Sequence, residues 1–185
     1  SYSILNRNNS GSDGNAYTTI QAAINACSPG DIIYMRGGTY YEHSIIIPNS
    51  KGGNAGNHTT LSSYPGEWAI IDANGTNVNG IANVGWNLWP NNNAEGYLRY
   101  FTFERFELTG ANTQNGFYMK TDTVYYRYLY IHNIKGSTGD GLKAGLFLFI
   151  PQNTLIEYCY FKDNENGTGA MGNNANIIFD ADQRD

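Results

Sequence analysis

A carboxylate and an amine stand close together in the segment Gly139-Asp140-Gly141-Leu142-Lys143. Successive side chains of a strand point to opposite faces, so inward-facing apolar neighbours place the Lys143 amine on the outer face. A lysine acts as a general base when a nearby cation lowers its pKa from about 10.4 toward the working pH. The segment therefore offers Lys143 as a candidate base. An ordinary Asp-Gly turn followed by a solvated lysine is the alternative interpretation.

Two further aspartates follow Asp140 at intervals that suit a repeating structure. Asp163 and then Asp180 come after it along the chain. If each interval amounts to about one coil, the three carboxylates approach one another on adjacent coils. Clustered carboxylates are the ligands that calcium prefers. The spacing thus predicts a metal site of Asp140, Asp163 and Asp180, with solvated corner carboxylates as the alternative.

Aromatic residues are concentrated in two of the expected strands. Residues 125–130 and 147–149 carry rings at both strand parities, so some rings must face outward. Exposed rings stack on sugars, and a basic residue beside them supplies the charge that an acidic sugar needs. We therefore predict that Arg127, Tyr126 and Phe147 contact the substrate. Stacked rings inside the fold are the alternative.

The elements that must position these side chains are short strands. Gly, Asn or Pro separates most of them, as expected of strands joined by tight corners. A weak repeat aligns residues 125–133 with 155–163, and residues 98–106 resemble the same unit, with Leu98 opposite Tyr125. Similar strands at variable offsets are typical of a solenoid whose coils differ in their corner loops. The expected strands cover 31–35, 44–47, 59–63, 69–72, 97–108, 116–120, 124–134, 141–149, 154–163 and 175–180.

One short helix is expected before the strands. Thr18 or Thr19 can cap its N-terminus, and apolar residues recur at helical spacing between Ile20 and Cys27. Pro29-Gly30 ends it. Such a helix can cover the open end of a solenoid. An antiparallel sandwich remains the alternative fold, because Asn-Gly and Asp-Gly pairs such as Asn115-Gly116 also suit hairpins.

The net charge and composition of the chain narrow the classes of partner that it can have. The chain has 185 residues and a formal net charge of -5 with no run of Lys or Arg, so nucleic acid is not an expected partner. No segment approaches the roughly 20 apolar residues of a membrane span, so no membrane association is expected. Cys27 and Cys159 are expected to be two separate buried thiols rather than a disulfide.

The opening of the chain resembles a known family. The residues that carry the resemblance are Gly11-Ser-Asp-Gly14, residues 17–24, residues 29–40, residues 59–67 and Ile70-Ile-Asp72. Together they resemble the N-terminal coils of pectate-lyase-like proteins, with the closest similarity to family nine polysaccharide lyases. The resemblance implies an all-β fold, a right-handed parallel β-helix with residues 1–30 as an N-terminal cap and residues 31–185 as coils.

The same resemblance implies a function. Lyases of this kind are secreted and cleave uronic-acid polymers by β-elimination with calcium as cofactor. By analogy with their catalytic lysine, which follows an Asp-Gly pair, Lys143 is the expected base and Asp140 a calcium ligand. The expected partner is an acidic polysaccharide such as pectate.

The C-terminal end has no recognisable cap, and family lyases are longer. We therefore expect a single domain that is truncated at its C-terminus, or one that associates end to end. The alternative functions are a non-catalytic β-helix that binds carbohydrate or forms an extracellular assembly, and a glycoside hydrolase using Asp140 and Asp163.

Overall fold

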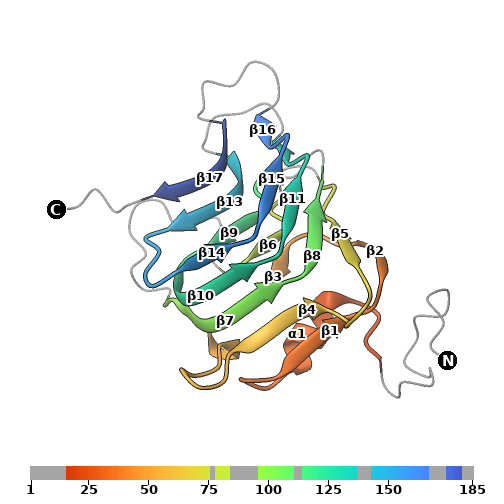
Figure 1. The fold of residues 1–185 in the computed structure, drawn as a ribbon, viewed down its shortest axis with the longest axis vertical. Coiled ribbons are helices and arrows are strands. Elements are labelled where there is room, and N and C mark those ends of the chain that lie inside the picture. Colours follow the sequence, from red (N-terminus) through yellow and green to blue (C-terminus); the bar gives the residue numbers. More distant parts are fainter. Residues whose placement is uncertain are drawn as a thin grey trace.

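The computed structural model describes residues 16–75, 78–83, 96–110, 114–136, 143–166 and 174–180. In this part of the chain, every pairing between named strands is parallel, and the strands form three five-stranded sheets, in each of which the strands are stacked along one common axis (Figure 1). Parallel strands that return to the same three sheets in turn make a β-helix. The predicted fold class is confirmed, and the alternative sandwich is wrong because its ladders would be antiparallel.

Each coil contributes one strand to each sheet, in the order sheet A, sheet B, sheet C. Sheet A contains β1 (Ile32–Met35), β4 (Thr59–Ser63), β7 (Leu98–Glu104), β10 (Thr121–Arg127) and β14 (Leu155–Glu157). Sheet B contains β2 (Gly38–Tyr41), β5 (Ala69–Asp72), β8 (Phe106–Thr109), β11 (Tyr130–His132) and β15 (Tyr160–Lys162). Sheet C contains β3 (Ile45–Ile46), β6 (Ile81–Ala82), β9 (Phe117–Met119), β13 (Lys143–Phe149) and β17 (Asn174–Asp180). A small extra pair joins β12 (Lys135–Gly136) to β16 (Glu165–Asn166).

The sequence repeat is the stacking register of the coils. Tyr125 pairs with Leu155 and Tyr130 pairs with Tyr160, so the predicted alignment of residues 125–133 with 155–163 is confirmed. The predicted alignment of the preceding unit is wrong. Leu98 pairs with Thr121 rather than with Tyr125, because the chain takes a shorter path outside the strands in that coil.

The corner between sheets A and B divides three of the expected long strands in two. Arg105, Tyr128 and Tyr158 stand at this corner with φ of 55°, 51° and 52°. A left-handed conformation costs a residue other than glycine roughly 1–2 kcal/mol, but it turns the chain sharply. Residues 97–108, 124–134 and 154–163 are therefore bent rather than continuous. The chain also forms β2, which was not predicted.

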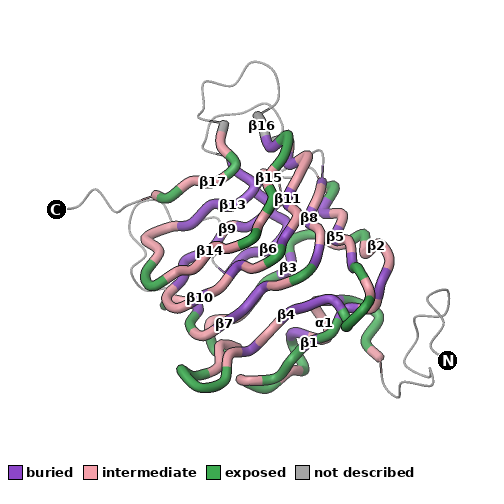
Figure 2. The backbone as a smooth tube through the Cα atoms, in the orientation of Figure 1, coloured by how far each residue is buried: buried purple, intermediate pink, exposed green. Residues whose placement is uncertain are grey.

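The interior is filled by large apolar side chains from all three sheets. Phe101, Phe103, Phe117 and Tyr126 are completely buried. Phe103 lies 4.7 Å from Phe101, 5.0 Å from Phe117 and 5.3 Å from Tyr126, measured between ring centroids. Figure 2 shows the buried segments recurring in coil after coil. The aromatic ladder is thus an internal one at these positions.

Buried asparagines satisfy the backbone at the corner that precedes sheet C. The Asn115 side chain donates to Oδ1 of Asn79 at 3.0 Å and accepts from the Ala144 amide at 2.8 Å. Asn164 accepts from the Ile134 amide at 3.1 Å. Because a bend removes ladder hydrogen bonds, these side chains replace partners that the buried backbone groups need.

The helix α1 (Ile20–Ala26) covers the first coil, close to the predicted range. Thr19 is the N-cap and accepts from the Ala22 amide at 3.1 Å, as predicted. The Glu42 carboxylate accepts from the first two amides of the helix, which the sequence did not suggest. Ile20 and Ile24 complete the interior at this end. In the described residues, no helix has the length and apolarity needed to cross a membrane.

Cys27 and Cys159 are both free thiols, partly rather than fully buried. The two are separate, as predicted, because they lie several coils apart. Burial raises the pKa of each thiol. Neither thiol is therefore activated as a nucleophile.

Replacing Phe117 with alanine tests the central position of its ring. Phe117→Ala should lower the free energy of unfolding by about 3–5 kcal/mol, because it removes ring contacts and leaves a cavity. Urea unfolding followed by circular dichroism measures the change. Tyr41→Ala is the matched control, since Tyr41 is 83% exposed and its loss should change stability by less than about 0.5 kcal/mol. Equal losses in both variants would contradict the assignment of Phe117 to the core.

Candidate functional site

The predicted site residues are distributed over all three sheets. Lys143 begins β13, Phe147 lies in the same strand and Asp180 ends β17, so these three belong to sheet C. Tyr126 and Arg127 end β10 in sheet A. Asp163 follows β15 in sheet B, while Asp140 and the side chain of Lys143 lie outside what the structure describes.

The two described aspartates do not come together. Asp180 pairs with Phe149 at the end of sheet C. Asp163 follows Lys162 at the end of sheet B, where its carboxylate lies 3.7 Å from the Lys162 amine. Asp163 and Asp180 therefore stand on different sheets of the same coil, and the interval between them is shorter than one full coil. The predicted juxtaposition of Asp163 and Asp180 is wrong.

The donor set for calcium does not assemble in the described residues. No three His, Cys, Asp or Glu side chains are grouped closely enough there to hold a metal ion. A calcium site needs several oxygen ligands around one point. Asp163 and Asp180, on different sheets, do not supply them.

Burial excludes Tyr126 as a substrate contact. Its ring is completely buried in the interior, stacked on Phe103, and burial raises the pKa of its hydroxyl well above the usual range. The prediction failed because strand parity alone does not tell which face is the interior. Phe147 has the outward parity but is only 4% exposed and packs against Tyr118 at 5.1 Å. As placed, it offers almost no surface to a polymer.

Arg127 lies on the outer face of sheet A, as its prediction requires. Its Nε is 2.7 Å from Oε1 of Glu157, and its guanidinium lies 4.8 Å above the Tyr125 ring. His58 also packs against Tyr125, with the ring centroids 4.6 Å apart. Burial lowers the pKa of His58, and the charge of Arg127 lowers it further. The charge of Arg127 is thus largely balanced by Glu157.

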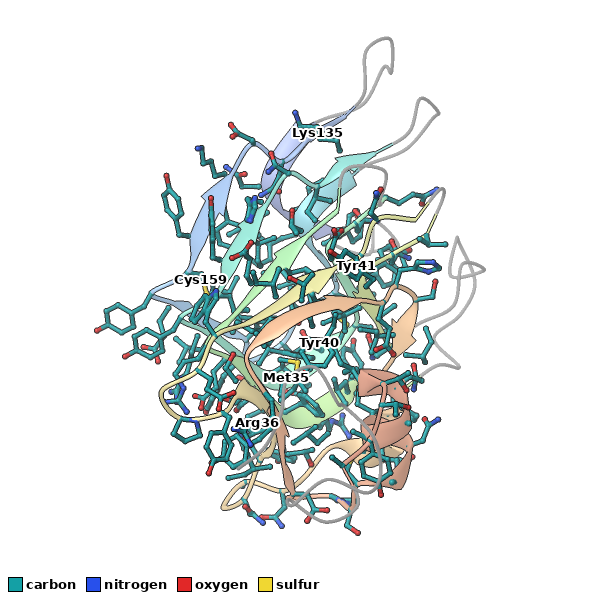
Figure 3. All side chains as sticks on the ribbon, turned by 90° about the vertical axis from the view of Figure 1, so that its right-hand side faces the viewer. Met35, Arg36, Tyr40, Tyr41, Lys135 and Cys159 are labelled. Carbon is teal, nitrogen blue, oxygen red and sulfur yellow. The ribbon has the colours of Figure 1, made fainter. Side chains whose placement is uncertain are left out.

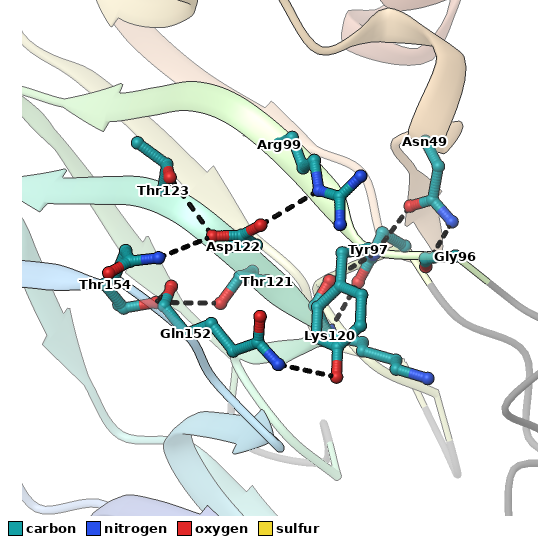
Figure 4. Close-up of polar contacts among 12 residues, drawn as sticks. Asn49, Gly96, Tyr97, Arg99, Lys120, Thr121, Asp122, Thr123, Gln152 and Thr154 are labelled. Carbon is teal, nitrogen blue, oxygen red and sulfur yellow. Dashed lines mark hydrogen bonds and ion pairs between the residues drawn. The ribbon is translucent and has the colours of Figure 1, made fainter. Parts of the chain in front are cut away.

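A second group of polar residues lies where the chain turns from sheet C into sheet A (Figure 4). We call Tyr97, Arg99, Lys120, Asp122 and Gln152 the corner cluster. Lys120 directly follows β9, and its backbone exchanges two hydrogen bonds with the Asn83 side chain, at 2.8 and 2.9 Å. These bonds hold Lys120 at the corner even though the strand has ended.

The Lys120 ammonium is the unusual charge of this cluster. Lys120 is 1% exposed, and its Nζ lies 4.8 Å from the centroid of the Tyr97 ring. Gln152 fixes this ring by donating to its hydroxyl at 3.3 Å. No carboxylate of the described residues lies within ion-pair distance of Lys120, so a ring face is its described partner. Cation–π attraction is worth about 2 kcal/mol when the pair is desolvated.

Arg99 and Asp122 form the exposed edge of the corner cluster. Arg99 Nε donates to Asp122 Oδ2 at 2.9 Å, and the same carboxylate accepts from Asn153 Nδ2 at 3.0 Å. These hydrogen bonds, first that of Asn153 and then that of Arg99, lower the pKa of Asp122 despite its partial burial. With Lys120 included, two cations face one carboxylate, so the corner cluster is positive.

A half-buried tyrosine lies beside this corner on the outer face of sheet C. Tyr118 is in β9, just before Lys120, and its ring covers Phe147. Burial raises the pKa of the Tyr118 hydroxyl, and the nearby charge of Asp180 raises it further. The outer face of sheet C beside the corner cluster therefore carries the Tyr118 ring and the carboxylate of Asp180.

The corner cluster was not predicted from the sequence. Its residues lie in three separate stretches of the sequence, and each looks like an ordinary charged or polar residue at a strand end. The one available signal was the position of Lys120, a charged residue that directly follows the apolar strand β9. Burial of its amine depends on neighbouring coils, which no local pattern reports.

The model of a family described as "Pel9A-like, right handed beta helix region" matches residues 4–178. No curated protein and no solved structure matches the chain.

The lowered pKa of Asp122 predicts a loss of stability in acid. Because the folded pKa lies below the unfolded value of about 4, its stabilising effect is complete above that value and disappears as pH falls through the folded pKa. Asp122→Asn should therefore lose less stability than the wild type between pH 5 and pH 2.5 (urea midpoints compared at each pH). Asp163→Asn, at an exposed corner, is the matched control. An unchanged acid dependence in Asp122→Asn would show that its hydrogen bonds do not stabilise the folded chain.

Proposed function

We propose that this chain, which belongs to the Pel9A-like right-handed β-helix family, is a secreted polysaccharide lyase, or the N-terminal portion of one, that acts on uronic-acid polymers. The observation that carries the proposal is the family match, which spans nearly the whole chain. The surface on which we place the polymer is the outer face of sheet C with the corner cluster.

β-Elimination sets the chemistry that the site must perform. A base removes the proton on the carbon next to the uronate carboxylate, the glycosidic carbon–oxygen bond breaks, and the leaving oxygen takes up a proton. The product carries a new carbon–carbon double bond. Negative charge grows on the carboxylate side during proton removal, so nearby positive charge stabilises the transition state. We assign proton removal to Lys143, at the start of β13.

The corner cluster gives the polymer a second point of attachment. Lys143 begins β13, whereas Lys120 lies level with the far end of that strand, since Met119 pairs with Leu148. A chain of uronates along sheet C would pass from the base to the positive corner. A buried charge acts through a low dielectric and is screened little by salt, so Lys120 contributes to binding without direct solvent contact.

Calcium remains part of this proposal only through Asp140, the ligand that the family resemblance implies. The described carboxylates do not fit a calcium site, so no step is assigned to the ion. Arg127 is proposed as a further contact for the polymer on the neighbouring sheet.

The second candidate function is a β-helix that binds carbohydrate without cleaving it. The separation of Asp163 from Asp180 favours it, because a lyase of this type uses grouped carboxylates. The two functions differ in one observable, the formation of an unsaturated product.

Substitution of Lys143 tests the lyase. Wild-type protein incubated with polygalacturonate should produce a rise in ultraviolet absorbance, and Lys143→Ala should slow it by about 10²–10⁴-fold, the usual contribution of a general base. Lys162→Ala, which removes an exposed lysine on sheet B, should leave the rate unchanged. A chelator arm tests the calcium requirement. If no uronate polymer gives a rise, the binding function replaces the lyase.

Substitution of Lys120 tests the positive corner. Lys120→Met keeps the length of the side chain but removes its charge, so retardation in gels containing polygalacturonate should weaken several-fold. Stability should be kept or raised, because an ammonium without a carboxylate partner is costly to bury. Thermal unfolding checks the second expectation. Unchanged retardation would remove Lys120 from the polymer-binding surface.

A further inference from the structure

The outer face of sheet B carries a second ordered group of aromatic and polar side chains. Glu107, Tyr130 and Tyr160 are paired in register on β8, β11 and β15, and His132 stands next to Tyr130 on the same face. Trp68, just before β5, reaches this row by donating from its indole to Glu107 Oε2 at 3.4 Å. We call Trp68, Glu107, Tyr130, His132 and Tyr160 the sheet B platform. Figure 3 views this side of the molecule, with Cys159 marking the corner next to β15.

The platform spans four consecutive coils, three of which contribute an aromatic ring. Trp68 is 43% exposed and Tyr160 61% exposed. At the usual coil spacing the row extends for roughly 14 Å, which is long enough for an oligosaccharide rather than a single sugar. The adjoining corner adds Tyr128 and Tyr158, whose rings stack 5.0 Å apart. Large rings gathered on one exposed face commonly mark a binding surface.

A fixed pair of polar side chains lies between the rings. His132 Nε2 is 2.8 Å from Glu107 Oε1, and its Nδ1 is 2.8 Å from Nδ2 of the Asn133 side chain. An amide nitrogen donates hydrogen bonds and does not accept them, so this contact favours the tautomer with its proton on Nε2, which faces Glu107. The Tyr130 ring stacks on His132 at 4.1 Å. A carboxylate held this way keeps free lone pairs that accept hydrogen bonds from sugar hydroxyls.

The charge of this face excludes an acidic polymer. Glu107 is negative, and Asp72 pairs with Thr109, which pairs in turn with His132. Lys162 is the cation nearest in register, and the Asp163 carboxylate lies beside it. A uronate chain on this face would therefore meet carboxylates of its own sign. Hydroxyl groups of an uncharged sugar meet hydrogen-bond acceptors and ring faces instead.

We propose that the sheet B platform binds a neutral polysaccharide. Its position on a different sheet separates it from the proposed lyase surface on sheet C. It would hold the protein on an uncharged polymer while sheet C meets an acidic one. The proposal does not depend on catalysis, and its variants should keep any activity on soluble polygalacturonate.

Affinity electrophoresis tests the platform directly. Wild-type protein is run in gels containing xyloglucan, hydroxyethylcellulose, galactomannan or polygalacturonate. We expect retardation by at least one neutral polymer, and Trp68→Ala and Tyr160→Ala should each weaken it about three- to tenfold, the usual range for one stacked ring. Tyr34→Ala removes an exposed ring from β1, on sheet A rather than sheet B, and should have no effect. Thermal unfolding confirms that each variant is folded.

A charge variant separates the two classes of polymer. Glu107→Gln keeps a side chain of the same shape but removes the negative charge, so polygalacturonate should then retard the protein more strongly than it retards the wild type. The proposal is overturned if no neutral polymer retards the wild type, or if Tyr34→Ala weakens binding as much as Trp68→Ala. A dimer that dissociates in Trp68→Ala, seen by sedimentation, would also overturn it, because the face would then hold a second copy.

Discussion

Parallel stacking of successive coils, with each residue opposite its counterpart one coil away, is the constraint on which this structure depends. Neighbouring strands are about 4.8 Å apart, so every position belongs to a row that runs along the axis. The side chains of a row must be apolar if the row faces the interior. At a corner, the residues of a row must adopt a backbone conformation that turns the chain. Phe103 and Tyr126 satisfy the first requirement, and Tyr128 and Tyr158 satisfy the second.

Most residues with an unfavourable left-handed backbone conformation stand at corners, and contacts between the side chains of a row offset the cost. A left-handed tyrosine at one corner is destabilising by itself, but its ring stacks on the next tyrosine in the row. At the corner before sheet C, asparagine side chains perform the equivalent task for the backbone. Arg99 and Asp122 likewise form their ion pair between the neighbouring coils of β7 and β10, rather than within one strand. Local strain is tolerated because identical corners support one another.

The proposed functions depend on which rows of side chains are exposed on the outer faces of the sheets. The interior rows are closed, so Tyr126 has no role outside the core. The outer rows differ in character: sheet C leads to a positive corner at Lys120, whereas sheet B presents rings around the Glu107–His132 pair. One solenoid can therefore offer different chemistry on each side without any change in its core. This arrangement supports our view that the chain meets two kinds of polymer.

The sequence by itself determined the class of fold, the capping helix with Thr18 or Thr19 at its N-terminus, and the register between the two tyrosine-rich units. These features depend on local patterns: a helical period, a capping hydroxyl and a repeated strand. Only the tertiary structure decided which face of β10 is interior, because Tyr125 and Tyr126 place rings on both of its faces; the role assigned to Tyr126 failed for this reason. The separation of Asp163 from Asp180, the register of β7 and the burial of Lys120 depend on the path of each corner loop. That path is fixed by contacts between coils far apart in the sequence.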